Sequence, residues 1–350
     1  MSTASAVTRY EPPRDLWVGV WLLAITVLVF AMILVGGATR LTDSGLSITE
    51  WNLEKGLIPP FSAERWAEEF ALYQHTTEYQ MQNQGMSLAE FQAIYWWEWG
   101  HRFLGKMIGL AFATPFAFFW ATGRLRGRFW PVLALFALGG AQGAIGWWMV
   151  TSGLFSGLDV SPVRLAIHLG MALALLAGAL WLAMDALGWP RDRADIGVSA
   201  RAAWAFVALL FAQIMFGALL AGADGGPAYS DWPTIGRELI PAHAFSLEPL
   251  WRNFTEHHAT QHLLHRTLGY CIALAAFALA WFGMRRGNGI GRRLALALGA
   301  LALIQALLGV AAIVTGAHLA LSLAHQACAA LLWTLATQAA RVAGNAIPQR

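Results

Sequence analysis

Four histidines, each near one end of an apolar segment, are the residues whose type and spacing could do chemistry. His101 lies in EWGHRFLG and His265 in HLLHRTLG, so the two share an HR..LG frame 164 residues apart. His168, in RLAIHLG, and His325, in LSLAHQA, follow them at similar intervals. A histidine inside a membrane is costly and normally faces the interior of a helix bundle for a functional reason. The two matched pairs therefore predict two bis-histidine sites, for which heme iron is the expected occupant.

The composition indicates the elements that must position these histidines. The chain has 350 residues, of which 57% are hydrophobic and only 12% are charged, whereas soluble domains carry about 25% charged residues. Apolar runs of about 20 residues are long enough to cross a bilayer as helices. We therefore expect an all-α polytopic membrane protein with no nucleic-acid partner. The eight expected spans are Leu16–Gly36, Tyr95–Trp120, Trp130–Val150, Val163–Leu187, Ala202–Ala221, Gln261–Trp281, Leu294–Val314 and Leu319–Ala339.

The distribution of basic residues predicts how the spans are oriented. Fourteen of the 23 Lys and Arg residues fall on one side of the eight-span topology. Short basic loops stay in the cytoplasm, so we expect both termini inside and the loops around residues 37–94 and 222–260 outside. The first 15 residues lack the pattern of a cleaved signal, which favours a retained anchor in a bacterial inner membrane. The basic residues on the inner side are Arg9, Arg14, Arg124, Arg126, Arg128, Arg191, Arg193, Arg201, Arg285, Arg286, Arg292, Arg293, Arg341 and Arg350.

The sequence also repeats internally. Gln142 and Gln305 each precede a glycine by four residues, and the outward loops carry SITEW with GLIPP and then AYSDW with ELIPA. We therefore expect two pseudo-symmetric four-helix halves, residues 1–190 and 191–350. Both halves begin on the inner side, so they are parallel repeats related by an axis along the membrane normal.

This topology predicts the depth of the histidines. The second, fourth, sixth and eighth spans all run from the outer side to the inner side. His101 is expected about six residues into its helix, and His168 follows Pro162, a favourable first-turn residue, by a similar interval. At about 1.5 Å per residue, each pair should lie roughly 10 Å below the outer surface. A heme standing between two helices needs two imidazoles at one depth.

Glu98 is the candidate for proton chemistry. It lies three residues before His101, hence on the same helix face, while the equivalent position of the second half is His262. The alternative role for Glu98 is an i,i+4 ion pair with Arg102. The difference between the halves predicts a catalytic site in the first half and a structural or electron-relaying site in the second.

Two arginines directly follow two of the histidines. Arg102 and Arg266 could neutralise heme propionates, which need cations near the outer interface. They could equally extend to lipid headgroups while their apolar stems stay in the membrane. The spacing alone does not distinguish these two roles.

Four motifs resemble one known family. GGATRLTDSGLSITEW after the first span, IYWWEWGHRFLG, HRTLGY and LAHQACAALLW are similar to the heme A synthase family in its proteobacterial and mitochondrial form. The resemblance covers about residues 15–340 and implies eight membrane helices in two pseudo-symmetric halves. One departure concerns the first outward loop, where some members from Gram-positive bacteria carry a cysteine pair. Both cysteines of this chain, Cys271 and Cys328, fall inside expected helices, so a mechanism using those thiols is not available here.

The resemblance implies an enzyme that oxidises a methyl group of heme O to the formyl group of heme A, the heme of cytochrome c oxidases. By motif match, His265 and His325 would ligate a resident heme b, whereas His101 and His168 would hold the substrate heme. Glu98 would be essential to turnover. If both first-half histidines bind the substrate iron, no position is open for O₂. Then either one histidine dissociates, or water attacks the methyl carbon after electrons leave through the ring.

The predicted heme sites imply a set of partners and leave two competing functions. Besides heme O, heme A and lipid, the candidate partners are an electron donor or acceptor system, a heme O synthase, subunit I of cytochrome c oxidase during assembly, and a second copy of the chain. A di-heme b-type electron carrier would share the bis-histidine sites but would hold two hemes permanently. A heme carrier would convert no heme O. The di-heme electron carrier would not need Glu98.

Overall fold

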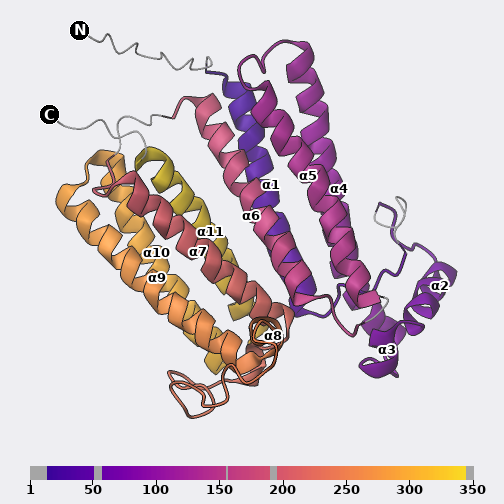
Figure 1. Ribbon diagram of the computed structural model, residues 1–350. Helices are drawn as coiled ribbons and strands as arrows, with labels where there is room; N and C mark the ends of the chain where they lie inside the picture. Colours follow the sequence, from indigo (N-terminus) through magenta and orange to yellow (C-terminus); the bar gives the residue numbers. More distant parts are fainter. Residues whose placement is uncertain (1–13, 51–56, 155–156, 190–194, 344–350) are drawn as a thin grey trace, which may run out of the picture.

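The computed structural model describes residues 14–50, 57–154, 157–189 and 195–343. Within these ranges the chain is helical and has no named strand, and eight of its helices are long and apolar enough to cross a membrane (Figure 1). This confirms the all-α fold and the eight expected spans. The eight helices are α1 Leu16–Leu41, α4 Leu88–Ala121, α5 Phe129–Leu154, α6 Pro162–Leu187, α7 Ala200–Gly222, α9 His258–Arg286, α10 Gly289–Val314 and α11 Leu319–Ala343.

Local sequence explains where these helices begin and end. Asp15 caps α1 by accepting hydrogen bonds from the backbone N–H groups of Trp17 and Val18, which satisfies donors that a helix start leaves free. Pro162 opens α6, where its missing N–H costs nothing, and Gly188 ends α6 in the left-handed conformation. Such signals depend on a few adjacent residues, so most span ends lie within five residues of their expected positions.

The long helices form two groups (Figure 1). We call α1, α4, α5 and α6 the first half, and α7, α9, α10 and α11 the second half. Helices α1 and α6 of the first half pack against α11 and α7 of the second. A single apolar core runs through both halves, and Trp333 Nε1 on α11 donates to the Leu173 carbonyl on α6 at 2.9 Å. The halves therefore share one core.

Some sequence features fall outside the described residues. They are Arg9, Arg191, Arg193, Arg350 and the boundary between residues 190 and 191. The division of the chain into residues 1–190 and 191–350 therefore stays a prediction.

The segments that follow α1 and α7 gather at one end of the molecule, which we call the outer end. Helices α2 (Ala63–Gln74) and α3 (Thr77–Met81) precede α4, whereas the 3₁₀ turn η1 (Gly226–Ala228) and α8 (Arg252–Glu256) precede α9 (Figure 1). Figure 1 shows α2, α3 and α8 at this end, and the start of α1 at the opposite end.

One expected helix start was wrong. The span expected from Tyr95 begins at Leu88, so His101 lies 13 residues after the first residue of α4 rather than about six. Ser87 and Glu90 form a capping box that starts the helix within the outer segment. Phe91 and Tyr95 then pack in an aromatic cluster with α2. Helix α4 therefore extends beyond the part of the chain that needs lipid.

Candidate functional site

The four histidines come from four different helices, α4, α6, α9 and α11. In the second half, the ring centroids of His265 and His325 lie 6.4 Å apart with an interplanar angle of 77°. In the first half, His101 on α4 and His168 on α6 are likewise neighbours. The fold thus brings together the two pairs that the repeat predicted.

The second-half pair has the spacing of two ligands on one metal. A metal–imidazole bond is about 2.0 Å long, and the ring centroid lies roughly 1.1 Å beyond the nitrogen, so two opposed imidazoles on one metal have centroids about 6.2 Å apart. The observed 6.4 Å agrees with that arrangement. The Nδ1 atoms of His168, His265 and His325 are also buried without a hydrogen-bond partner, which is rare for buried polar atoms. The residues present therefore fit a metal held between facing imidazoles.

Each histidine ring lies against a glycine of a neighbouring helix. A Cβ atom at any of these glycines would lie 2.8 to 3.2 Å from the ring, so a larger side chain would displace the imidazole. The contacts repeat in the same order in the two halves, between α1 and α4, α5 and α6, α7 and α9, and α10 and α11. The pairs are Gly36 with His101, Gly146 with His168, Gly217 with His265, and Gly309 with His325.

The repeated glutamines lie beside the second histidine of each pair. Gln142 Nε2 lies 3.4 Å from His168 Nε2 and also donates to the His168 carbonyl at 3.0 Å. Gln305 Nε2 lies 3.2 Å from His325 Nε2. A carboxamide at this position limits how the imidazole turns, so these glutamines orient the ring. The sequence repeat singled them out without predicting this contact.

Glu98 is buried and held by hydrogen bonds to both of its oxygens. Its Oε1 accepts from Arg102 Nε at 3.0 Å and from Arg102 Nη2 at 2.6 Å. Its Oε2 accepts from Ser47 Oγ and from the Ile48 backbone N–H, both at 2.8 Å. The i,i+4 ion pair with Arg102 is therefore formed, and it fixes a carboxylate one helical turn from His101. Ser47 and Ile48 were not expected at the site, although both belong to the repeated loop sequence.

Arg102 also binds the outer segment itself. Its Nη2 donates to the Ile48 carbonyl at 2.8 Å and its Nη1 to the Glu50 carbonyl at 3.0 Å. The guanidinium thus joins α4 to the segment that leaves α1. A role of Arg102 toward heme propionates stays a prediction.

Arg266 makes the matching contacts in the second half. Its Nη2 donates to the Tyr229 carbonyl at 3.2 Å and its Nη1 to the Asp231 carbonyl at 2.9 Å. These two residues occupy the places of Ile48 and Glu50 in the repeat. His262, four residues before Arg266, lies with its Nδ1 3.1 Å from Nη2. In both halves, an arginine therefore bonds backbone carbonyls of the outer segment and the side chain four residues earlier. We call this set of contacts the arginine clamp; it holds the Glu98 carboxylate in the first half and the His262 imidazole in the second.

The halves differ in how two of their helices pack. In the second half, α9 and α10 lie close together, and a Cβ atom on Gly299 would come within 2.7 Å of the Ala280 methyl group. In the first half, α4 and α5 meet through large rings toward the inner end, where Phe112 and Phe136 stack at 5.2 Å. Rings of this size hold the two helix backbones further apart than glycine and alanine do.

The boundary between α4 and α5, which we call the seam, continues from Phe136 toward the outer end with glycines on the same face of α5. Gly139, Gly140 and Gly143 of α5 have no other side chain or segment within 4 Å of the place where a Cβ would stand. The second half has Ala302, Leu303 and Ala306 at the equivalent positions of α10. The first half therefore leaves space one to two turns from Gly146, which contacts His168.

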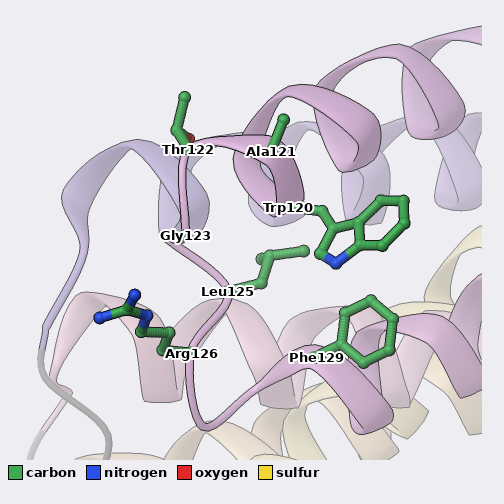
Figure 2. Close-up of a pocket in the computed structure, with 7 residues that line it drawn as sticks. All are labelled: Trp120, Ala121, Thr122, Gly123, Leu125, Arg126 and Phe129. Atoms are coloured by element: carbon green, nitrogen blue, oxygen red, sulfur yellow. The ribbon is translucent and has the colours of Figure 1, made fainter.

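A hollow of about 470 Å³ lies away from these histidines (Figure 2). It surrounds the turn between α4 and α5 at the inner end, about 20 residues beyond His101 along α4 and hence roughly 30 Å away. Figure 2 shows Trp120 and Phe129 on one side of it and Arg126 on the other. Because it is so distant from the histidines, it does not belong to the site described above.

The chain is similar to known proteins along nearly its whole length. The model of the COX15-CtaA family, described as cytochrome oxidase assembly protein, matches residues 19–337. A protein of Maricaulis maris named heme A synthase is 48% identical over 334 residues, covering 94% of this chain and 97% of that protein. Proteins of the same name from Parvibaculum lavamentivorans and Hyphomonas neptunium are each 44% identical, over 90% and 96% of this chain and 91% and 95% of their own lengths.

Proposed function

The chain belongs to the COX15-CtaA family of cytochrome oxidase assembly proteins, and from this premise we propose the reaction, the cofactor and the residue roles of its site. It is an enzyme that acts on heme, with the function for which its relatives are named heme A synthase. The reaction is the oxidation of a methyl group of heme O to the formyl group of heme A, which cytochrome c oxidase requires. The observation that carries this function is the similarity along nearly the whole chain, together with the two histidine pairs that it covers.

The second half holds a resident heme b between His265 and His325. Their centroid distance of 6.4 Å supports an iron between them, and the close packing of α9 and α10 supports a cofactor that stays bound. When bound, this heme supplies reversible one-electron transfer. The protein holds its two imidazoles through Gly217 and Gly309, which leave room for the rings.

The first half holds the substrate heme between His101 and His168. A substrate must enter and its product must leave, and the open seam between α4 and α5 supports that role. The difference in packing, rather than the histidines themselves, distinguishes the substrate half from the resident half, because the ligands are alike in both.

Glu98 handles protons during the oxidation. With water as the oxygen source, each of two rounds adds one water to the methyl carbon and removes two protons and two electrons. The resulting gem-diol then loses water to give the aldehyde. Glu98 accepts protons or orients the water, and Arg102 with Ser47 holds the carboxylate in place. If O₂ is the source instead, one first-half histidine must leave the iron. In both routes the electrons pass to or from an external redox partner.

The protein resides in a bacterial inner membrane with both termini in the cytoplasm. The positions of the basic residues support this orientation, and the eight apolar helices show a multi-pass membrane protein. Its other partners are a heme O synthase, subunit I of cytochrome c oxidase, and a second copy of the chain. The histidine sites then lie near the outer face.

Single-histidine variants test this assignment. His325→Ala should remove the low-spin heme b or make it high-spin, because one of its two ligands is lost. His101→Ala should retain that heme and stop heme A formation. The measurements are reduced-minus-oxidised spectra of the purified protein, and chromatography of the extracted hemes.

The same measurements separate the competing functions. A di-heme carrier would contain two b hemes per chain in the wild type and would lose one in each variant. A heme carrier would leave heme O unconverted when a redox partner is supplied. Retention of an unchanged low-spin spectrum in both His265→Ala and His325→Ala would mean that the resident pair is misassigned.

A further inference from the structure

Gln326, the residue after His325, reaches from the second half into the first. Its Nε2 donates to the Ile33 carbonyl of α1 at 2.7 Å. The two residues are 293 positions apart in sequence, and the bond crosses the interface between α11 and α1. A carboxamide among apolar helices has few other partners, so one good hydrogen bond defines its position.

Glycine at position 37 makes this contact possible. A methyl group on Gly37 would overlap the Gln326 carboxamide, so the amide lies directly on the backbone of α1. The preceding residue is Gly36, where a Cβ would lie 3.2 Å from His101 Nε2. One turn of α1 therefore contacts Gln326 on one side and the imidazole of His101 on the other. This turn therefore connects the neighbour of His325 to a backbone contact of His101.

The equivalent positions in the sequence repeat, on α6 and α7, are apolar. Leu169 follows His168 in α6, and Ile214 and Ala218 of α7 stand where α1 has Ile33 and Gly37. Leu169 and Ile214 pack with the shared apolar core. Packing of the halves therefore does not require an amide at this position, since an aliphatic side chain serves on the opposite side.

We propose that Gln326 is a positioning residue that couples the two heme sites, fixing the ligand His325 relative to the turn of α1 that supports His101. This role rests on the proposed function, in which one site relays electrons and the other holds substrate. The bond holds α11 and α1 in one register, and His325 and His101 take their places from those two helices. Loss of the bond lets the His325 ring turn and changes how the two hemes face each other.

Two variants remove the contact from opposite sides. Gln326→Met keeps the length and volume of the side chain but has no N–H to donate. Gly37→Ala keeps the amide but displaces it from the α1 backbone. We expect each variant to keep its low-spin resident heme while kcat for heme A formation falls about tenfold, less than the roughly hundredfold that a 1 Å misplacement of reacting groups can cost. KM for heme O should change little in Gln326→Met, because that residue touches no substrate.

A spectroscopic readout separates positioning from a general loss of stability. The ferric low-spin g-values in electron paramagnetic resonance depend on the angle between the two axial rings, 77° in this structure. Both variants should shift these values. The matched control is Trp333→Phe, which removes another side-chain donor to a backbone carbonyl across the same two halves, about two turns further from His325. The control should lower the melting temperature without changing the g-values or kcat.

The outcomes distinguish this proposal from the proposed function. Wild-type g-values and kcat in both Gln326→Met and Gly37→Ala would overturn the positioning role. An equal shift in Trp333→Phe would also overturn it, because any loosened interface would then give the same signal. If the wild type makes no heme A, the proposed function fails, and the g-values still test Gln326 independently.

Discussion

The same arginine clamp holds a carboxylate in one half and an imidazole in the other. Arg102 and Arg266 both bind backbone carbonyls of the outer segment and the side chain four residues earlier. That earlier residue is Glu98 in the first half and His262 in the second. Since the clamp is common to both halves, it accounts for a structural role of Glu98. The proposed proton chemistry depends instead on the carboxylate, which only the first half has at this position.

Glu98→Gln tests that difference. The amide keeps the shape and accepts a bond from Arg102 but provides no base, a role worth about 10²–10⁴ in rate. We expect the variant to fold, retain heme b and bind heme O while making little heme A. Chromatography of hemes extracted from cells that express the variant would measure this, and the alcohol intermediate should accumulate.

The control is Glu256→Gln, which neutralises an i,i+4 glutamate–arginine pair of the same kind on the surface, where Arg252 Nη2 lies 2.7 Å from Glu256. Its heme A yield should equal that of the wild type. Heme A formation at the wild-type rate in Glu98→Gln would limit Glu98 to holding Arg102.

Glu78 gives the outer segment a pH dependence. Burial raises the pKa of its carboxyl to about 8, and the charges of Asp159, Glu98 and Asp43 add to that effect, whereas a hydrogen bond from Tyr73 opposes it. The pKa of Glu78 in the folded state lies above its unfolded value. The contribution of the protonated carboxyl to the stability of the folded outer segment is therefore fully present below about pH 4.5. It is lost as the pH rises through 8.

We therefore expect Glu78→Gln to protect α2 and α3 at alkaline pH. The amide stays neutral, so the difference in stability between variant and wild type should grow from pH 6 to pH 9 in favour of the variant. Amide hydrogen exchange in residues 63–81 at both values would measure it. A difference that stays constant with pH would show that Glu78 does not titrate in this range.

At the scale of helices, the packing of one pair separates two otherwise similar halves. Aromatic rings hold α4 and α5 apart at their inner ends, whereas Gly299 and Ala280 bring α9 and α10 together. The glycines of α5 then leave space along the outer part of the seam, near His168, which we propose as a ligand of the substrate heme. We expect a bulky apolar substrate to enter from the bilayer through the half whose helices are separated in this way.

Gly143→Leu should obstruct that passage. The added side chain fills space that is open in the wild type, so we expect KM for heme O to rise several-fold while the resident heme b stays unchanged. Steady-state heme A formation at varied heme O would measure it. The matched control is Ala306→Leu, the exposed equivalent on α10, which should leave KM unchanged. Equal effects of the two substitutions would contradict a passage between α4 and α5.

At the scale of the molecule, the eight helices alternate in direction, so both ends of the chain should be cytoplasmic. Reporter fusions at residues 126, 195 and 289 should show cytoplasmic locations, and fusions at 60, 157 and 240 should show the outer side. The physical reason is the concentration of basic residues in the first set of loops. An outer-side signal at residue 289 would contradict the alternation of the second half.

Local hydrophobicity and the internal repeat were enough to predict the eight spans and the two histidine pairs. An apolar run of sufficient length crosses a bilayer whatever surrounds it, so the spans required no knowledge of packing. The duplication then placed His101 with His168 and His265 with His325, because repeated sequences fold into repeated structures. Helix starts such as Pro162 are local signals as well. The capping box of Ser87 and Glu90 is also local, and it starts α4 before the expected position at Tyr95.

The hydrogen-bond partners around the histidine sites, and the difference in helix packing between the halves, depend on the tertiary structure. The Ile48 N–H bonds Glu98 from 50 residues away, and Gln326 finds Ile33 across 293 residues. Neither partner can be read from spacing along one helix. The open seam likewise depends on which rings of α4 meet α5. Such contacts are set by the packing of helices that are distant in sequence, whereas hydrophobicity and repeats act locally, which is why the sequence predicted the ligands and not their surroundings.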